Sequence, residues 1–397
     1  MSQIKEKIKN LSNEFYPKIQ NIRHHLHANP ELSFEEVNTA NFIESVLHEL
    51  GFTETQRVAK TGISFIIKGN GKSDKVVALR ADIDALPITE ANEVSYKSTN
   101  PGVMHACGHD VHTSSLLGAI MIFKELQSEL DGDIKIIFQP GEERLPGGAS
   151  LMIKEGILEN PKPAKILGQH VMPFIDSGKV GFRKGMYMAS ADEIYFTVTG
   201  KGGHAAMPES LVDPVLITSH IIVALQQIIS RNSSPKIPSV LSFGKVVAEG
   251  ATNVIPNEVN VEGTFRTYDE TWRTDAHLRM KKMAEGMAES MGATCHFEVR
   301  KGYPHLKNHP EYTQANMDAA KSYLGEENVE EIDLWLAGED FAFYSHHVDA
   351  CFYRLGTRNI EKGIVSGVHT PTFDIDEESL KIGMGLMAWL TFNELKR

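Results

Sequence analysis

The sequence is poor in cysteine and in positive charge. Only three of its 397 residues are cysteines, Cys107, Cys295 and Cys351. An odd, sparse set of cysteines is not a disulfide framework, so we expect a reducing compartment. Forty basic against 52 acidic side chains give a formal net charge of -12. This balance argues against binding to nucleic acid or to an anionic membrane through bulk charge.

Long hydrophobic runs are also missing. The best apolar run, Leu116–Phe123, has eight residues, whereas a membrane-spanning helix needs roughly 18. The first residues, Met1–Lys7, alternate charged and apolar side chains and lack the apolar stretch of a signal peptide. These absences predict a soluble cytoplasmic protein with no membrane partner.

Histidine, by contrast, is abundant. Hydrophobic residues make up 41% and charged residues 23% of the chain, which is a globular composition. The length suggests two or three domains. The chain holds 17 histidines, many of them next to Gly, Asp or Pro. Because histidine ligates metals and changes charge near neutrality, the positions of these residues direct the search for a site.

Local patterns near the N-terminus predict helices and a hairpin. Apolar residues recur at spacings of three and four from Ile4 to Leu26, which predicts an amphipathic helix that Pro17 breaks in two or restarts. Ser33 followed by Glu36 indicates a capping box at the start of the next helix. An Asn-Gly pair between the apolar segments 63–68 and 75–81 predicts a β-hairpin.

One continuous apolar run and two similar runs, each interrupted by a single lysine, predict strands that are buried on both faces. They are Val76–Leu79, Ile134–Phe138 and Ala164–Leu167, and a helical stretch at about 113–126 separates the first two. Buried strands that alternate with helices indicate an α/β domain. We expect a mixed, mostly parallel sheet with helices on both faces.

The pattern changes between residues 189 and 301. Strand, helix, two strands, helix and strand follow one another there, which is the βαββαβ order of a ferredoxin-like α+β domain. Asp213 and Pro214 mark the start of the first of these helices. We therefore expect a discontinuous domain, residues 1–188 and 302–397, interrupted by a smaller inserted domain, residues 189–301.

Polar residues follow the carboxyl ends of the three buried strands. Asp82 and Asp84 follow the first strand, Glu142 and Glu143 the second, and His170 the third. Ligands of open α/β sheets bind at this edge. Each residue alone could be a solvated loop side chain, and Glu142 with Glu143 could be a solvated acidic turn. Acidic and histidine side chains at three strand ends together indicate one shared site.

The densest cluster of such residues is His105–His112. Cys107 and His109 stand two positions apart, with Gly108 between them to let the backbone bend. Thiolate and imidazole suit zinc and similar divalent ions. A buried cysteine with incidental histidines and a nucleophilic Cys–His pair are the alternatives.

Three further loops contain glycine or histidine in patterns that permit ligand contact. Gly200–Ala206 includes three glycines and His204, and it is either a ligand loop or an ordinary glycine turn. Gly338–Phe341 and Val368–Pro371 contain acidic residues and His369.

Taken together, these motifs resemble the M20 metallopeptidases, in particular the aminoacylase and hippurate hydrolase branch of amidohydrolases. That branch includes plant auxin-conjugate hydrolases and bacterial N-acetyl-diaminopimelate deacetylases. The matching segments follow family order across nearly the whole chain. They are Arg23, His27–Leu32, Leu79–Pro87, Met104–Thr113, Phe138–Glu143, Gly168–His170, Gly202–Pro208, Asn253–Pro256, Gly338–Phe341 and His369.

The resemblance implies a site with two divalent ions per subunit. Zinc or manganese would be the first expectation, with cobalt and nickel as further options. The implied ligands are Cys107, His109, Glu143, His170 and His369. Cys107 stands where the wider family has a bridging carboxylate, which leaves the metal open because a thiolate favours softer ions.

Catalytic and substrate-binding roles are implied in the same way. Glu142 matches the general base, and Asp84 matches a residue that orients the metal site. His204, Asn253 and Arg266 would hold the substrate carboxylate and the oxyanion. Because the equivalent of His204 can enter the partner's active site in related enzymes, the resemblance implies a homodimer formed through the inserted lid domain.

The implied reaction is hydrolysis of N-acyl-L-amino acids, of the N-acetyl or N-benzoyl type, by a water activated by two metals with Glu142 as base. The substrate would be a small molecule. Alternatives in the same family are an N-acetyl-diaminopimelate deacetylase and a dipeptidase or carboxypeptidase. Outside that reaction class, the alternatives are a binding protein with a vestigial site and a cysteine amidase using Cys107.

Overall fold

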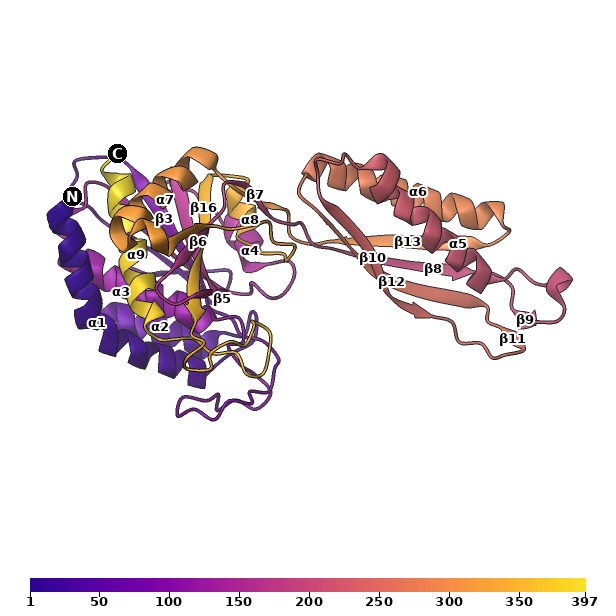
Figure 1. Ribbon diagram of the computed structural model, residues 1–397, viewed down its shortest axis with the longest axis horizontal. Coiled ribbons are helices and arrows are strands. Elements are labelled where there is room, and N and C mark those ends of the chain that lie inside the picture. The colour runs from indigo at the N-terminus through magenta and orange to yellow at the C-terminus, as the bar shows by residue number, and fades with distance from the viewer. The chain divides into compact units, whose positions relative to one another are not determined.

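The chain divides into two units in the computed structural model, which describes residues 1–397. The first unit consists of Met1–Gly185, Lys307–Leu334 and Asp340–Arg397 (Figure 1). The second consists of Met186–Leu306 and Trp335–Glu339. The last of these segments lies outside the inserted domain that the sequence predicts.

An eight-stranded sheet forms the centre of the first unit. The four strands β4, β3, β5 and β16 run parallel, and β1 and β2 pair antiparallel at one edge. The prediction of a mixed, mostly parallel sheet is confirmed. In spatial order the strands are β1 (Gln56–Val58), β2 (Gly62–Ile67), β4 (Asp133–Gln139), β3 (Val76–Asp82), β5 (Lys165–Asp176), β16 (Asp349–Arg358), β6 (Val180–Phe182) and β15 (Val329–Glu331).

The predicted hairpin between β2 and β3 is wrong. These strands are not neighbours, because β4 lies between them and pairs with both. The Asn70 side chain donates to the carbonyl of Ser128, and the Asn70 N–H donates to the carbonyl of Leu130. The Asn-Gly segment therefore binds the chain leading into β4 and does not close a two-residue turn.

Helices cover the sheet of the first unit. They are α1 (Ser2–Ala28), α2 (Val37–Glu49), α3 (His109–Glu125), α4 (Gly148–Lys154), α7 (Pro310–Leu324), α8 (Ala342–Ser345) and α9 (Ser379–Leu395), with short 3-10 turns at Gln127–Glu129 and Glu326–Asn328. α1, α3 and α9 pack against one another (Figure 1). Their apolar side chains share one core with the sheet.

Two helix predictions near the N-terminus need correction. Pro17 lies inside a single continuous helix α1, whose apolar face, including Ile8, Ile19 and Leu26, is buried in the core on both sides of it. The burial of this face outweighs the one backbone hydrogen bond that proline removes. The predicted capping box is wrong, because α2 begins at Val37 and no side-chain hydrogen bond caps it from Glu36.

The second unit contains a four-stranded antiparallel sheet in the order β10-β12-β8-β13. Asp213 caps α5 by accepting hydrogen bonds from the N–H groups of Val215 and Leu216, as the sequence predicts. The elements are β8 (Asp192–Thr199), β9 (Gly203–His204), a 3-10 turn (Pro208–Ser210), α5 (Pro214–Gln227), a π-turn (Ile228–Asn232), β10 (Ser239–Val247), β11 (Val254–Ile255), β12 (Glu258–Thr267), α6 (Glu270–Ser290) and β13 (Thr294–Lys301). The remaining elements are the short strands β7 (Gly185–Met188) and β14 (Leu306–Asn308).

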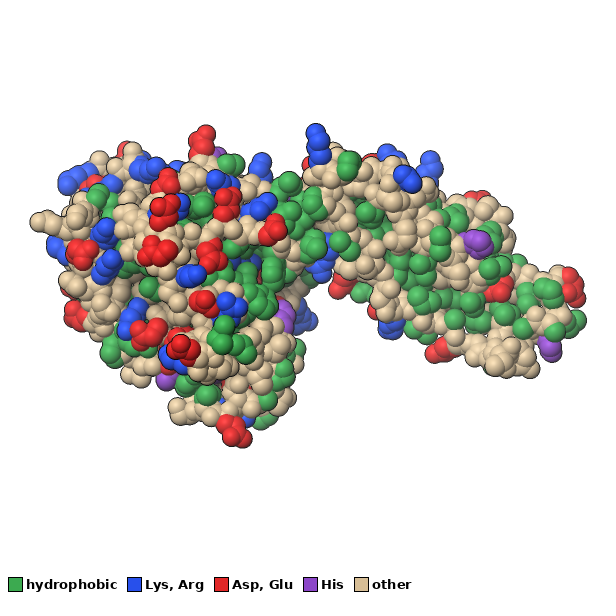
Figure 2. Space-filling model, in the orientation of Figure 1, with side chains coloured by type: hydrophobic (Ala, Val, Ile, Leu, Met, Phe, Trp, Pro, Cys, Tyr) green, Lys and Arg blue, Asp and Glu red, His purple; other side chains and the backbone are tan.

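The helical segment Pro214–Asn232 is long and apolar enough, by length and composition, to cross a membrane. Core helices of soluble proteins share this length and composition. Ile217, Ile221 and Leu225 on one side of it pack into the core of the second unit. On its other side, Leu216 and Val223 are exposed. Hydrophobic side chains are visible on the surface of this unit in Figure 2.

Candidate metal centre

The candidate metal centre lies at the carboxyl ends of the parallel strands of the first unit. β3 ends in Asp82, with Asp84 just beyond it, and β4 leads into Glu142 and Glu143. His170 lies on β5, which is hydrogen-bonded to β3. Because neighbouring parallel strands end at the same edge, residues far apart in sequence meet there.

Gly108 delivers the Cys-Gly-His segment to this edge. Its φ of 79° lies in the left-handed region, and a Cβ there would stand 2.6 Å from a methyl carbon of Val171. Only glycine meets both conditions without strain. The turn allows helix α3 to begin at His109, so Cys107 projects from the loop and His109 from the first helical turn.

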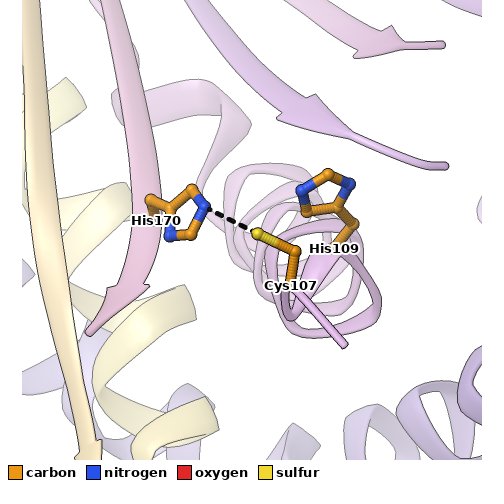
Figure 3. A group of neighbouring side chains, drawn as sticks. All are labelled: Cys107, His109 and His170. Atoms are coloured by element: carbon orange, nitrogen blue, oxygen red, sulfur yellow. Dashed lines mark hydrogen bonds between the residues drawn. The ribbon is translucent and has the colours of Figure 1, made fainter. Parts of the chain in front are cut away.

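Cys107 lies between two imidazoles. Its Sγ is 3.5 Å from Nε2 of His170 (Figure 3) and 3.3 Å from Nε2 of His369. Nδ1 of His170 lies 2.7 Å from the carbonyl oxygen of Val171, which can only accept. Nδ1 therefore carries the proton, and Nε2 presents its lone pair toward the thiol.

Asp84 holds the other half of the centre in place. Its Oδ1 is 3.1 Å from Nδ1 of His109, and its Oδ2 accepts the N–H of Glu143 at 3.0 Å. Ser33 donates a further hydrogen bond to Oδ2. A carboxylate on Nδ1 turns Nε2 of a histidine outward, which is how metal-ligating histidines are commonly oriented.

Glu143 faces both His109 and His369. Its Oε1 lies 3.9 Å from Nε2 of His109 and 3.2 Å from Nε2 of His369, the latter a close contact without hydrogen-bond geometry. His369 has a backbone φ of 61°, unusual for a residue with a side chain, and its N–H donates to the carbonyl of Ala106. Such a conformation persists where the surrounding contacts enforce it.

Two buried polar atoms in the centre make no hydrogen bond. They are Nε2 of His109 and Oε1 of Glu143. Leaving such an atom unsatisfied costs about 1–3 kcal/mol, and a cation between them would satisfy both. The sets Cys107-His109-His170, Cys107-Glu143-His369 and His109-Glu142-Glu143 each bring their ligand atoms within 4.8 Å of one another. These sulfur, nitrogen and oxygen donors fit a divalent metal.

The electrostatics of the centre also favour a cation. Burial alone lowers the pKa of His109, but the nearby carboxylates of Asp82 and Asp84 outweigh it and raise that pKa to about 10. Burial raises the pKa of the Cys107 thiol well above its usual value, and the charges of Glu143 and Glu142 add to the rise. The site thus attracts positive charge, and a metal would replace the thiol proton on binding.

Glu142 is buried beside the centre. It is 6% exposed, and its Oε1 lies 3.3 Å from the N–H of Asp340, which donates to it. The alternative of a solvated acidic turn is therefore wrong. The alternative of a cysteine with incidental histidines also fails on geometry, because His109 and His170 gather with Cys107 in one group.

Several supporting residues were not recognised in the sequence. His112 stands between Asp82, on its Nδ1 side, and the N–H of Val171, which donates to its Nε2. Arg80, fully buried, donates to both Asp82 and Asp340. The position of Asp82 at a strand end was the one available signal. Its partner His112 lies 30 residues away in sequence, and Asp340, the other acceptor of Arg80, lies 260 residues from that arginine.

The three predicted substrate-binding residues belong to the second unit. His204 on β9 is exposed and pairs with Val254 of β11, and the N–H of Ala205 donates to the carbonyl of Asn253. His204 and Asn253 are therefore neighbours. Arg266 lies on β12, where its Nε donates to Thr264.

The glycines around His204 have a packing role. A Cβ at Gly200 would stand 2.2 Å from the carbonyl oxygen of Val212, and one at Gly202 would stand 2.3 Å from that of Ile255. Both glycines let backbone segments come into contact, as expected of an ordinary glycine turn.

Comparison with known proteins identifies relatives over the whole chain. The model of peptidase family M20/M25/M40 matches residues 78–392. An N-acyl-L-amino acid amidohydrolase of Geobacillus stearothermophilus is 41% identical over 307 residues, covering 77% of this chain and 82% of that protein. Thermostable carboxypeptidase 2 of Saccharolobus solfataricus is 36% identical, covering 95% of each chain.

A solved structure has the same fold. The YxeP protein of Bacillus subtilis, described as a dinuclear metal-binding peptidase of the M20 family, superposes with a TM-score of 0.83. It is 33% identical in sequence, and the match covers 97% of this chain and 99% of that one.

Proposed function

Because the chain belongs to peptidase family M20/M25/M40 and is a hydrolase, we propose that it hydrolyses the amide bond of N-acyl-L-amino acids. The products would be a carboxylate and a free amino acid. The observation that carries the proposal is the buried carboxylate of Glu142 beside a cluster of sulfur, nitrogen and oxygen donors. The amidohydrolase from Geobacillus supports an N-acyl amino acid as the substrate.

Cys107, His109, Glu143, His170 and His369 would hold two divalent ions per subunit. A dinuclear relative and the number of donors support two ions. The thiolate favours zinc, although manganese, cobalt and nickel also suit imidazole and carboxylate. Bound there, the ions would supply Lewis acidity, polarising the amide carbonyl and making water more acidic.

Glu142 is the proton carrier in this proposal. It takes a proton from the attacking water and returns it to the leaving amine, as a general base and then a general acid. The hydrogen bond from the Asp340 N–H holds one carboxylate oxygen, Oε1. Asp84 acts on the reaction indirectly, by orienting His109 and Glu143.

The second unit would bind the rest of the substrate. We assign the substrate carboxylate and the oxyanion to His204, Asn253 and Arg266, which offer cationic and amide donors. The βαββαβ order and the antiparallel sheet support a ferredoxin-like lid domain. Exposed apolar side chains on α5, Leu216 and Val223 among them, support a homodimer formed through this unit.

A cysteine amidase is the less favoured reading. A nucleophilic cysteine needs a lowered thiol pKa, whereas burial raises the pKa of Cys107. Peptide cleavage is the second candidate reaction, because the relative from Saccharolobus is named a carboxypeptidase. It would use the same metal centre, as would an N-acetyl-diaminopimelate deacetylase.

A substrate panel separates these reactions. N-acetyl, N-benzoyl and indole-acyl amino acids, N-acetyl-diaminopimelate and dipeptides would be assayed with zinc, manganese, cobalt and nickel in turn. We expect the highest kcat/KM with an N-acyl amino acid. A higher kcat/KM for dipeptides would replace the proposed function with the peptidase.

A further inference from the structure

The segment 31–36, between α1 and α2, touches the loops that carry the candidate metal centre. The N–H of Ala85 donates to the carbonyl of Glu31, and Oγ of Ser33 donates to Oδ2 of Asp84. The segment precedes residues 78–392, where the family model matches. Its contacts reach across the chain to strand ends that come much later in sequence.

Glu36 makes the most extensive of these contacts. It is fully buried, and its Oε1 accepts the N–H groups of Phe34 and of Gly141, each at 2.8 Å. Its Oε2 accepts the hydroxyl of Thr61 at 2.7 Å. Burial of a carboxylate is costly unless it is hydrogen-bonded in this way. The Glu36 side chain makes no capping hydrogen bond to α2, and Glu31 accepts the N–H groups of Asn38 and Thr39 in its place.

Gly141 is pressed against the same segment. Its φ is 58°, and a Cβ on it would lie 2.4 Å from two ring carbons of Phe34. Phe34 itself has a φ of 66°. Glycine adopts this left-handed region freely, whereas a residue with a side chain rarely does. The Glu36 carboxylate bridges the N–H groups of both residues. The Phe34 conformation needs surroundings that enforce it, and such conformations gather at functional sites.

Gly141 directly precedes Glu142. The N–H of Asp340 holds Oε1 of Glu142, while Glu36 holds the peptide N–H one residue earlier in the chain. A misplacement of about 1 Å at a catalytic group can cost about 10²-fold in rate. A contact that fixes the Gly141 backbone is therefore suited to control where the Glu142 carboxylate lies.

We propose that Glu36 is a positioning residue for the reaction, placing Glu142 by holding the backbone of Gly141. This inference rests on the proposed function, in which Glu142 moves the proton. Glu36 contacts no substrate in this account. It fixes the loop geometry that Glu142 needs, and its loss should lower kcat while leaving substrate binding and metal content in place.

Replacing Glu36 tests the proposal. We expect Glu36→Ala to lower kcat by about 10- to 100-fold with KM within about twofold of wild type and metal content unchanged. Glu36→Gln should recover most of the loss, because its amide oxygen accepts both N–H groups and its NH2 group donates to Thr61. Glu35→Ala, which removes an exposed neighbouring carboxylate, is the matched control.

Three results would overturn the proposal. They are wild-type kcat in Glu36→Ala, a loss of bound metal in proportion to activity, and a Gln variant as slow as the Ala variant. Failure of the proposed function is distinguishable, because Glu142→Ala would then remain active. If both assignments hold, Glu36→Ala combined with Glu142→Ala should be no slower than Glu142→Ala alone.

A second pair of variants covers the case in which Glu36→Ala does not fold. Gly141→Ala drives a methyl group into the Phe34 ring and should lower kcat. Adding Phe34→Ala removes the ring and should restore part of kcat. No recovery in the double variant, or wild-type kcat in Gly141→Ala, would overturn the proposed link between this backbone and Glu142.

Discussion

At the scale of single residues, the proposed metal binding should depend most on the thiol of Cys107. It is buried between two histidines, and its environment holds the proton on sulfur. A metal must displace that proton, so affinity should rise with pH. The same group is the one donor in the centre that oxidation would remove.

Removing this thiol should empty the centre. We expect Cys107→Ala to lose most of its bound divalent metal, measured by elemental analysis of the purified protein, because it deletes the sulfur shared by two of the donor sets. Cys295→Ala, a change in the second unit, should keep the wild-type metal content. Full metal occupancy in Cys107→Ala would refute ligation by the thiol.

Sequence motifs identified the residues that meet in the centre, because each stands next to a strand end or on a short loop. They did not reveal the residues that hold those groups. Asp340 reaches Glu142 from 198 positions away, and Glu36 reaches Gly141 from 105. Nothing in local pattern or spacing encodes such contacts, which depend on how the strands are ordered in the sheet.

At the scale of elements, apolar periodicity and the Asp213 cap predicted helices correctly, whereas the hairpin pairing of β2 with β3 and the capping box of α2 were wrong. The apolar recurrence that the sequence shows from Ile4 to Leu26 lies within α1, Ser2–Ala28. The hairpin and the capping box failed because short polar motifs have several uses. Asn70 binds the segment before β4, and Ser33 binds Asp84. Local propensity was overridden in both cases by contacts with distant parts of the chain.

Two helical glycines should respond in opposite ways to alanine. A Cβ on Gly118 of α3 would lie 2.8 Å from Cβ of Met384 on α9, so the helices must move apart. That strain, about 1–3 kcal/mol, should exceed the gain in helix propensity of about 1 kcal/mol. Gly286 of α6 has nothing within 4 Å of such a Cβ, so Gly286→Ala should stabilise by about 0.5–1 kcal/mol.

Denaturant unfolding of Gly118→Ala and Gly286→Ala measures whether each change lowers or raises the free energy of unfolding. A Gly118→Ala protein as stable as wild type would show that α3 and α9 separate without cost. A destabilised Gly286→Ala protein would contradict the open surroundings of that position.

The first turn of α6 should make stability sensitive to acid. Burial alone raises the pKa of Glu270, but hydrogen bonding from His305 and the charge of Arg273 outweigh it and lower that pKa to about 2. The unfolded value is about 4.3. A lowered pKa contributes stability that is fully present above the unfolded value and is lost as pH falls toward 2.

Chemical denaturation across this pH range tests the contribution. Wild type should be more stable than Glu270→Gln at about pH 6, and the difference should shrink as the pH falls through 4 to about 2. Glu289→Gln, an exposed change on the same helix, should show no such trend. A difference between wild type and Glu270→Gln that stays constant with pH would contradict the lowered pKa.

At the scale of the whole molecule, the proposed homodimer should depend on the outer face of α5. Leu216 and Val223 are 53% and 73% exposed and stand seven residues apart, on one side of the helix. Val223→Glu should convert a dimer into a monomer in sedimentation experiments, because it buries an unpaired charge at the interface. Glu54→Lys in the first unit should leave the mass unchanged. A monomeric wild type, or a dimeric Val223→Glu variant, would contradict this interface.

The fold class could be predicted at this scale because it rests on the alternation of buried strands and helices along the chain. The return of Trp335–Glu339 to the second unit could not, because five residues carry too little pattern. Substrate preference also lies outside local sequence signals, since it depends on side chains gathered from distant segments.

The central claim is that Glu142 moves the proton in a hydrolysis that depends on two bound metals. The most direct test measures metal content and turnover of an N-acyl amino acid for wild type and Glu142→Gln side by side. We expect two divalent ions per chain in both proteins and a kcat lower by about 10²- to 10⁴-fold in the variant. Wild-type turnover by a fully metal-loaded Glu142→Gln protein would contradict the account.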